Sequence, residues 1–112
     1  MAERGDVLQL QRRLGFGTDP DPERVIVVQA TSLCSALPTL VVVPLDPDPT
    51  LGRSSLSVRV SPAESGAARE QFALPVELRA VIASRVAPGR VGRLRPRTLA
   101  DLDHKLRLVL DL

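Results

Sequence analysis

Two continuous aliphatic runs constrain the fold of this chain most strongly. Residues 24–29 read Arg-Val-Ile-Val-Val-Gln and residues 39–45 read Thr-Leu-Val-Val-Val-Pro-Leu. Such runs are typical of strands that are buried on both faces or lie at the centre of a barrel. The tetrapeptide Asp-Pro-Asp-Pro precedes the first run at residues 19–22 and follows the second at residues 46–49. Because each proline removes a backbone donor, both tetrapeptides are expected at strand ends, as rigid turns.

Weaker patterns indicate further strands. Leu56 to Val60 is apolar at every second residue, which indicates a half-exposed strand. The other predicted strands are residues 5–10, residues 71–82 with a bend at Pro75, and residues 91–94 at a sheet edge. Residues 31–38 and 61–66 are predicted as loops, because small residues, proline and glycine dominate them.

A single helix is predicted at the C-terminus. Thr98 followed by Asp101 resembles a capping box in its Asp form, so the helix is expected to begin there. Five apolar residues then fall on one face: Leu99, Leu102, Leu106, Val109 and Leu110. Strands dominate and one helix covers them. The expected fold is therefore mainly β (α+β), a single domain over residues 1–112 with a small, curved antiparallel sheet or partly open barrel and a C-terminal helix.

The shortage of aromatic residues limits what the surface can recognise. Phe16 and Phe72 are the only aromatic residues in 112, and Trp and Tyr are absent. The core must therefore be built from Val, Leu, Ile and Ala. Surfaces that stack bases on rows of aromatic side chains, such as RNA-binding sheets of the RRM type, are excluded.

Charge is divided unevenly along the chain. The formal net charge is +2, with residues 1–56 carrying five Arg against seven acids and residues 57–112 carrying nine Arg and one Lys against six acids. Arg85 to Arg97 contains five arginines and no acid. This stretch is either a solvated rim or an anion-binding surface, and the sequence leaves both interpretations open.

Several kinds of chemistry find no support in the sequence. No glycine-rich phosphate loop, zinc-ligand spacing or Ser-His-Asp signature is present. His104 falls on the polar side of the predicted helix, and Cys34 is expected to be an inert thiol in a reducing cytoplasm. No signal peptide or membrane-spanning run is expected. Asp19, Asp21, Asp46 and Asp48 would supply oxygen ligands if their loops met, but rigid turns are favoured and no metal or cofactor is expected.

The succession of elements resembles the MazF/PemK toxins of type II toxin–antitoxin modules. The resemblance covers nearly the whole chain, in the right order, and rests on five segments: Arg4 to Val7, Arg24 to Gln29, Val41 to Leu45, Leu78 to Val81 and the C-terminal Leu108 to Leu112. It implies a sheet of the CcdB/MazF/Kid type and a cytoplasmic homodimer. It also implies a metal-independent endoribonuclease, an mRNA interferase that cleaves single-stranded RNA and is inhibited by an acidic antitoxin.

The resemblance also assigns candidate site residues. Arg24 matches the family arginine that contacts phosphate and transfers a proton, with Val25 in place of the usual Pro. Asp46 occupies the position of the family Thr or Ser that stabilises the reacting phosphate. An ionised carboxylate accepts hydrogen bonds and repels phosphate, whereas a hydroxyl donates to it. Asp46 therefore acts as a base on the 2′-hydroxyl, or pairs with Arg24 until RNA arrives, or marks a lost activity.

Four arginines are predicted to contact RNA: Arg12, Arg53, Arg79 and Arg85. Arg79 matches a recurrent family arginine, while Glu77 stands where Gln is common. Two alternatives to the nuclease remain. One is a protein of the same fold without nuclease activity that binds RNA or acts as a regulatory or antitoxin module. The other is a gyrase poison of the CcdB kind, which the C-terminal Leu110-Asp111-Leu112 disfavours because that activity is tied to aromatic-ended C-termini.

Overall fold

The predicted antiparallel sheet with a C-terminal helix is confirmed in the computed structural model, which describes residues 2–11 and 22–112. The strands are β1 (Asp6–Gln9), β2 (Arg24–Val27), β3 (Thr39–Asp46), β4 (Val58–Val60), β5 (Gln71–Ala73), β6 (Arg79–Ile82) and β7 (Gly92–Arg93). The helices are α1 (Thr31–Cys34), α2 (Pro62–Ser65) and α3 (Pro96–Leu110), with short 3-10 turns η1 (Pro49–Arg53), η2 (Pro75–Glu77) and η3 (Ala83–Arg85). Over these ranges, no helix is long and apolar enough to cross a membrane.

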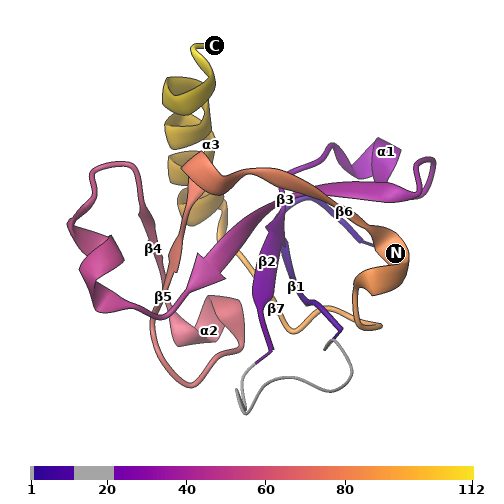
Figure 1. Cartoon of the computed structure of the whole chain (residues 1–112), viewed down its shortest axis with the longest axis horizontal. Helices are drawn as coiled ribbons and strands as arrows, with labels where there is room; N and C mark the ends of the chain where they lie inside the picture. Colours follow the sequence, from indigo (N-terminus) through magenta and orange to yellow (C-terminus); the bar gives the residue numbers. More distant parts are fainter. Residues whose placement is uncertain (1, 12–21) are drawn as a thin grey trace.

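The sheet is built around β3, its longest strand. The strand order is β4-β5-β3-β2-β1-β7, and β6 also pairs with β3. Every described pairing is antiparallel. The sheet therefore divides along β3, which pairs with β6 through its first half and with β5 at its end (Figure 1). The helix α3 extends away from the sheet, with the C-terminus at its far end (Figure 1).

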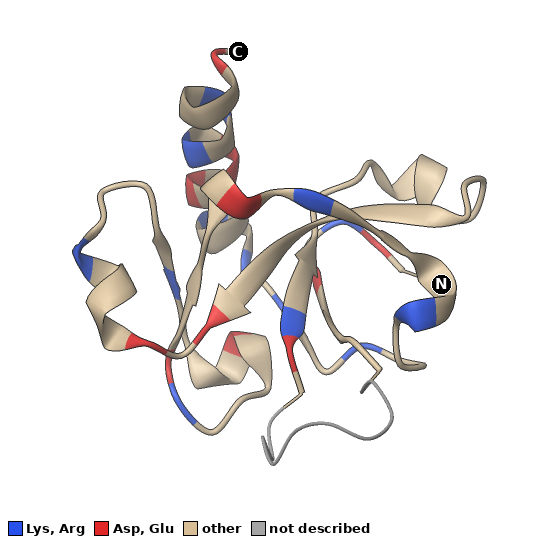
Figure 2. Ribbon diagram, viewed as in Figure 1, with Lys and Arg blue, Asp and Glu red and all other residues tan. Residues whose placement is uncertain are grey.

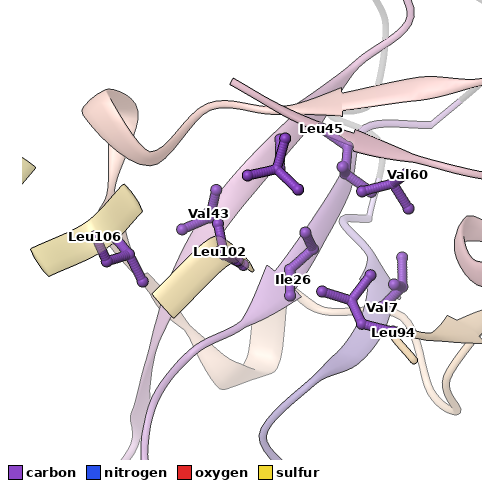
Figure 3. Packing of buried hydrophobic residues seen from close by; sticks show 10 residues of the cluster. Val7, Ile26, Val43, Leu45, Val60, Leu94, Leu102 and Leu106 are labelled. Atoms are coloured by element: carbon purple, nitrogen blue, oxygen red, sulfur yellow. The ribbon is translucent and has the colours of Figure 1, made fainter. Parts of the chain in front are cut away.

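One face of the sheet carries the larger apolar core. Val7, Ile26 and Val43 lie on neighbouring strands and are fully buried. Leu102 and Leu106 of α3 pack against them, as Figure 3 shows. Among the described residues, the core is aliphatic apart from Phe72 of β5.

The opposite face of the same strands carries a second apolar cluster, formed by Leu8, Val25, Val27, Leu40 and Val42. Consecutive residues of β2 alternate between the two clusters, since side chains of a strand point to opposite faces in turn. The expectation that residues 24–29 and 39–45 form strands buried on both faces is confirmed for β2 and the central part of β3.

Three local predictions were wrong, each for a physical reason. Residues 71–82 form two strands, because Pro75 begins a 3-10 turn that carries the chain from one end of β3 to the other. Residues 31–38 and 61–66, predicted as loops, contain the short helices α1 and α2. Each helix has only four residues, so it fits within a segment rich in small residues, proline and glycine. The helix α3 begins at Pro96, since proline at the first helical position has the φ angle that a helix needs.

Glu64 holds the beginnings of two helices together. Its carboxylate accepts hydrogen bonds from the Ser61 hydroxyl (3.0 Å) and from the Arg95 N–H (3.0 Å). Only 5% of Glu64 is exposed. Burial acts to raise the pKa of this carboxyl, but hydrogen bonds from Thr98, Arg95 and Ser61 outweigh burial, so the pKa lies below its usual value.

Replacing Glu64 by Gln is expected to lower the free energy of unfolding at neutral pH by about 1–3 kcal/mol, because the side-chain amide keeps one accepting oxygen and its NH₂ cannot accept the hydrogen bond made to the other. A lowered pKa in the folded state stabilises the protein above the unfolded pKa of about 4.3 and ceases to do so as the pH falls through the folded value. The difference between wild type and Glu64→Gln should therefore shrink in acid. Urea unfolding at several pH values measures it.

The matched control is Glu70→Gln, which removes an exposed carboxylate that pairs with Arg59 on the surface. It is expected to change stability by less than about 1 kcal/mol at any pH. A Glu64→Gln protein as stable as this control at neutral pH would contradict the assigned role.

Candidate functional site

Arg24 is the first residue of β2 and is almost completely buried. Only 8% of it is exposed. It lies opposite Gln9 of β1, and extending the pairing of Val25 with Pro44 by one residue places Leu45 of β3 on its other side. Because Ile26 and Leu45 belong to the larger core, alternation places the Arg24 side chain on that face of the sheet. The adjacent buried residues fix its position.

The Arg24 guanidinium has a hydrogen-bond donor that none of the described residues uses. Its Nε is buried and has no hydrogen-bond partner among the described residues. A buried donor without a partner costs about 1–3 kcal/mol, and more when it belongs to a charged group. Guanidinium groups donate paired hydrogen bonds to phosphate and carboxylate oxygens. Arg24 is therefore a side chain with capacity to bind an oxyanion.

Asp46 ends β3, and its carboxylate is engaged in its own loop. Its Oδ1 accepts a hydrogen bond from the Asp48 N–H (2.9 Å). The Asp48 carboxylate in turn accepts from the Thr50 N–H and hydroxyl, which lowers the pKa of Asp48. The second Asp-Pro-Asp-Pro run is thus a pair of successive Asx turns leading into η1.

Arg24 and Asp46 lie at neighbouring strand ends but on opposite faces of the sheet. The β2–β3 pairing ends at Val25 and Pro44, and alternation beyond it places the Arg24 side chain on the face of Ile26 and Leu45 and the Asp46 side chain on the other face. No ion pair among residues 2–11 and 22–112 joins Arg24 to Asp46. One interpretation of the sequence was that Asp46 pairs with Arg24 until RNA arrives. The described structure does not contain this ion pair, so that interpretation is wrong for this structure.

A different ion pair occupies the Asp46 face. The Arg79 guanidinium of β6 lies 2.5 Å from the Glu23 carboxylate, across β3. Figure 2 shows acidic and basic segments side by side at the start of β2, and an acidic segment at the tip of β3. The partnership of Glu23 with Arg79 was not predicted from the sequence. Only the pairing of β3 with both β2 and β6 brings these residues, 56 positions apart, together.

The other predicted RNA-contacting arginines are dispersed. Arg53 ends η1 and Arg85 ends η3, and both are exposed. These two turns lie on opposite sides of the molecule in Figure 1, η1 in magenta and η3 in orange. Arg12 and the acids Asp19 and Asp21 lie outside the described residues. Within the described ranges, no group of three or more His, Cys, Asp or Glu is arranged to hold a metal ion.

The basic stretch from Arg85 to Arg97 has two parts. Arg90 and Arg93 bind the buried carboxylate of Asp6 at 3.4 and 2.6 Å, and Arg93 also contacts Glu3. Their charge is therefore used to hold β7 and the preceding loop against β1. Arg85, Arg95 and Arg97 are exposed and make no ion pair within the described part of the chain.

The single cysteine lies on α1 and the single histidine on α3. Cys34 lines a pocket of about 620 Å³ on the face of the second apolar cluster. Burial raises the pKa of its thiol, which keeps the sulfur protonated and unreactive at neutral pH. His104 lies exposed on α3.

Comparison with known proteins gives consistent results. The profile of the PemK-like, MazF-like toxins of type II toxin–antitoxin systems matches residues 3–110. A mycobacterial endoribonuclease solved in complex with its cognate antitoxin superimposes with a TM-score of 0.75 at 16% identity, over 99% of this chain and 94% of the other. No curated protein matches the sequence.

Two further structures agree with this fold. The Mycobacterium tuberculosis toxin MazF-mt6 gives a TM-score of 0.78 at 13% identity, over 96% of this chain and 97% of the other. MazE–MazF from Deinococcus radiodurans gives a TM-score of 0.77 at 16% identity, over 99% and 96%. Identities this low show a common fold, so the predicted sheet of the MazF type is confirmed.

Proposed function

This chain belongs to the PemK-like, MazF-like toxins of type II toxin–antitoxin systems, and from that membership we propose that it is an endoribonuclease that cleaves single-stranded RNA without a metal ion. One observation carries the proposal. Arg24, at the start of β2, is buried and keeps an unpartnered Nε among the described residues. A buried cation with donors to spare is better suited to an oxyanion ligand than to a structural role.

The proposed chemistry is transfer of the phosphate within RNA. The 2′-oxygen forms a bond to phosphorus, the bond from phosphorus to the 5′-oxygen breaks, and the 2′-hydroxyl proton ends on the departing 5′-oxygen. Negative charge grows on the phosphate oxygens during this step. The Arg24 guanidinium donates hydrogen bonds to those oxygens and stabilises that charge. Arg12, Arg53, Arg79 and Arg85 are proposed to hold other phosphates along the RNA, since aromatic platforms for bases are nearly absent.

Arg24→Met is expected to reduce cleavage of a long single-stranded RNA by at least about 100-fold, because it removes the donors to the reacting phosphate. The assay is run with EDTA, since the proposal requires no metal. The free energy of unfolding should stay the same or rise, because methionine fills similar space without a buried charge. Loss of activity with unchanged stability distinguishes a functional arginine from a structural one.

Arg4→Met is the matched control. Arg4 donates to the Val28 carbonyl oxygen and pairs with Asp103 of α3, so its removal should lower stability by about 1–3 kcal/mol and leave cleavage by the folded protein intact. Cleavage that is undiminished by Arg24→Met would contradict the role of Arg24, and cleavage that is abolished by EDTA would contradict a metal-independent reaction.

A second candidate function is a MazF-fold protein without nuclease activity that binds RNA or regulates a partner. Asp46 favours it, because a carboxylate replaces the family hydroxyl and is held by the Asp48 N–H. In the nuclease proposal Asp46 is the companion of Arg24, and its carboxylate slows the reaction that the family hydroxyl would assist. The two functions differ in whether the wild-type protein cleaves RNA.

Asp46→Thr is expected to raise kcat/KM for RNA by about tenfold, because a hydroxyl donates to the phosphate where the carboxylate repels it. Asp46→Asn is the control that removes the charge and retains an oxygen for the Asp48 N–H. Activity that appears only in Asp46→Thr would identify the wild type as an inactive member. Loss of activity in both variants would instead show that the Asp46 carboxylate takes part in the reaction.

We propose that the partners are a second copy of the chain and an acidic antitoxin, in the cytoplasm. Two of the solved structures similar to this chain contain a toxin with its antitoxin. On this chain, the exposed Arg85, Arg95 and Arg97 offer positive charge to an acidic segment. The exposed Leu33, Leu37 and Ile82 offer apolar area for self-association.

Sedimentation velocity is expected to give the mass of a dimer for the chain alone, and a heavier complex with a candidate acidic antitoxin peptide. The complex should weaken as salt rises, because exposed charges are screened. Replacing Arg95 and Arg97 together by Gln should weaken it further, whereas Arg107→Gln, near the other end of α3, should not. A complex that is insensitive to salt would contradict this electrostatic assignment.

A further inference from the structure

The Glu23–Arg79 ion pair occupies the surface where RNA is proposed to bind. Glu23 directly precedes Arg24, and Arg79 is one of the proposed phosphate contacts. Their side chains are 2.5 Å apart, and each is 44% exposed. Both are therefore accessible to a ligand, but in this structure each is the partner of the other.

Asp46 adds a second carboxylate to this face. The pairing of β2 with β3 ends at Val25 and Pro44, and alternation beyond that pair places Glu23 and Asp46 on the same face of the sheet. Arg79 lies on β6, on the far side of β3, and its side chain reaches Glu23. Withdrawing Arg79 therefore removes the cation that is paired with the Glu23 carboxylate in this structure.

We propose that Glu23 sets the affinity of this protein for RNA by competing with the RNA backbone for Arg79. A phosphate that binds Arg79 must displace the Glu23 carboxylate and must lie close to its negative charge. Binding there is weaker than an unpaired arginine would allow. The inference rests on the proposed function, because it assumes that this face meets RNA, and it assigns to Glu23 a role in affinity and none in the chemical step.

Glu23→Gln is expected to tighten binding, because the neutral amide no longer holds Arg79 as an ion pair. The probe is a single-stranded RNA oligonucleotide with 2′-O-methyl groups, which lacks the attacking hydroxyl and stays intact. Fluorescence anisotropy should give a dissociation constant about two- to fivefold lower at low salt, the range expected for an exposed ion pair. The salt dependence should steepen by up to about 0.7 in logarithmic slope, since Arg79 then neutralises a phosphate.

Two further variants test whether the change in RNA affinity is specific to the Glu23–Arg79 ion pair. In an Arg79→Gln background, Glu23→Gln should have no effect. Glu70→Gln removes the same charge and releases Arg59 of β4 in the same way, and it should leave RNA affinity unchanged. An equal gain in Glu70→Gln would show a general charge effect and would overturn the inference.

The remaining outcomes separate this inference from the proposed nuclease. If Glu23→Gln binds RNA as wild type does, or more weakly, the inference fails even where cleavage is observed. If the affinity changes as expected and no RNA is cleaved, the inference stands and the nuclease proposal fails. If no variant binds the oligonucleotide at low salt, both are overturned.

Discussion

Burial of β2 and β3 on both faces is the constraint on which the rest of this structure depends. Val25, Ile26 and Val27 are each completely buried, and they alternate between two separate apolar clusters. Neither strand can rotate or shift by a residue without moving apolar side chains between clusters. The residues at the strand ends are therefore held as firmly as the core. Arg24 is buried because it continues β2, and its charge makes that position costly for stability and useful for binding an anion.

The parts of the fold that local sequence patterns determine could be predicted. The two aliphatic runs and the apolar stripe of the last helix each depend on residues close in the chain. The start of α3 could not be predicted in the same way. Thr98 has the composition of an N-cap, but the helix begins at Pro96 and its first turn receives the carboxylate of Glu64, about 30 positions earlier. When the residue that caps a helix comes from another element, the sequence near the helix start carries no sign of it.

The candidate site could be predicted only as a set of residues. The family resemblance picked out Arg24, Asp46 and Arg79 without placing them relative to one another. Their placement needs the register of β2 against β3, and strands that are apolar on both faces carry no alternation from which a register follows. One residue of register decides on which face Asp46 lies relative to Arg24. In the structure Asp46 lies on the face opposite to that of Arg24, and this face also carries Glu23 and Arg79.

The uneven charge of the two halves of the chain takes on a structural meaning here. Acids of the first half pair with arginines of the second: Asp6 with Arg90 and Arg93, Glu3 with Arg93, and Glu23 with Arg79. The partners of the Asp6 pairs are more than 80 positions apart, so these contacts join the ends of the chain and use up much of the positive charge. The net charge of +2 is therefore a poor measure of local anion binding. Where arginines are unpaired, the surface binds anions better than this charge suggests, and where acids neutralise them it binds anions less well. Arg24, Arg85, Arg95 and Arg97 make none of the described ion pairs, whereas Arg79 becomes available only when Glu23 releases it. On this basis, the capacity of the surface to bind an anion depends on which arginines the acids of the first half leave unpaired, and the total number of arginines is a poor guide to it.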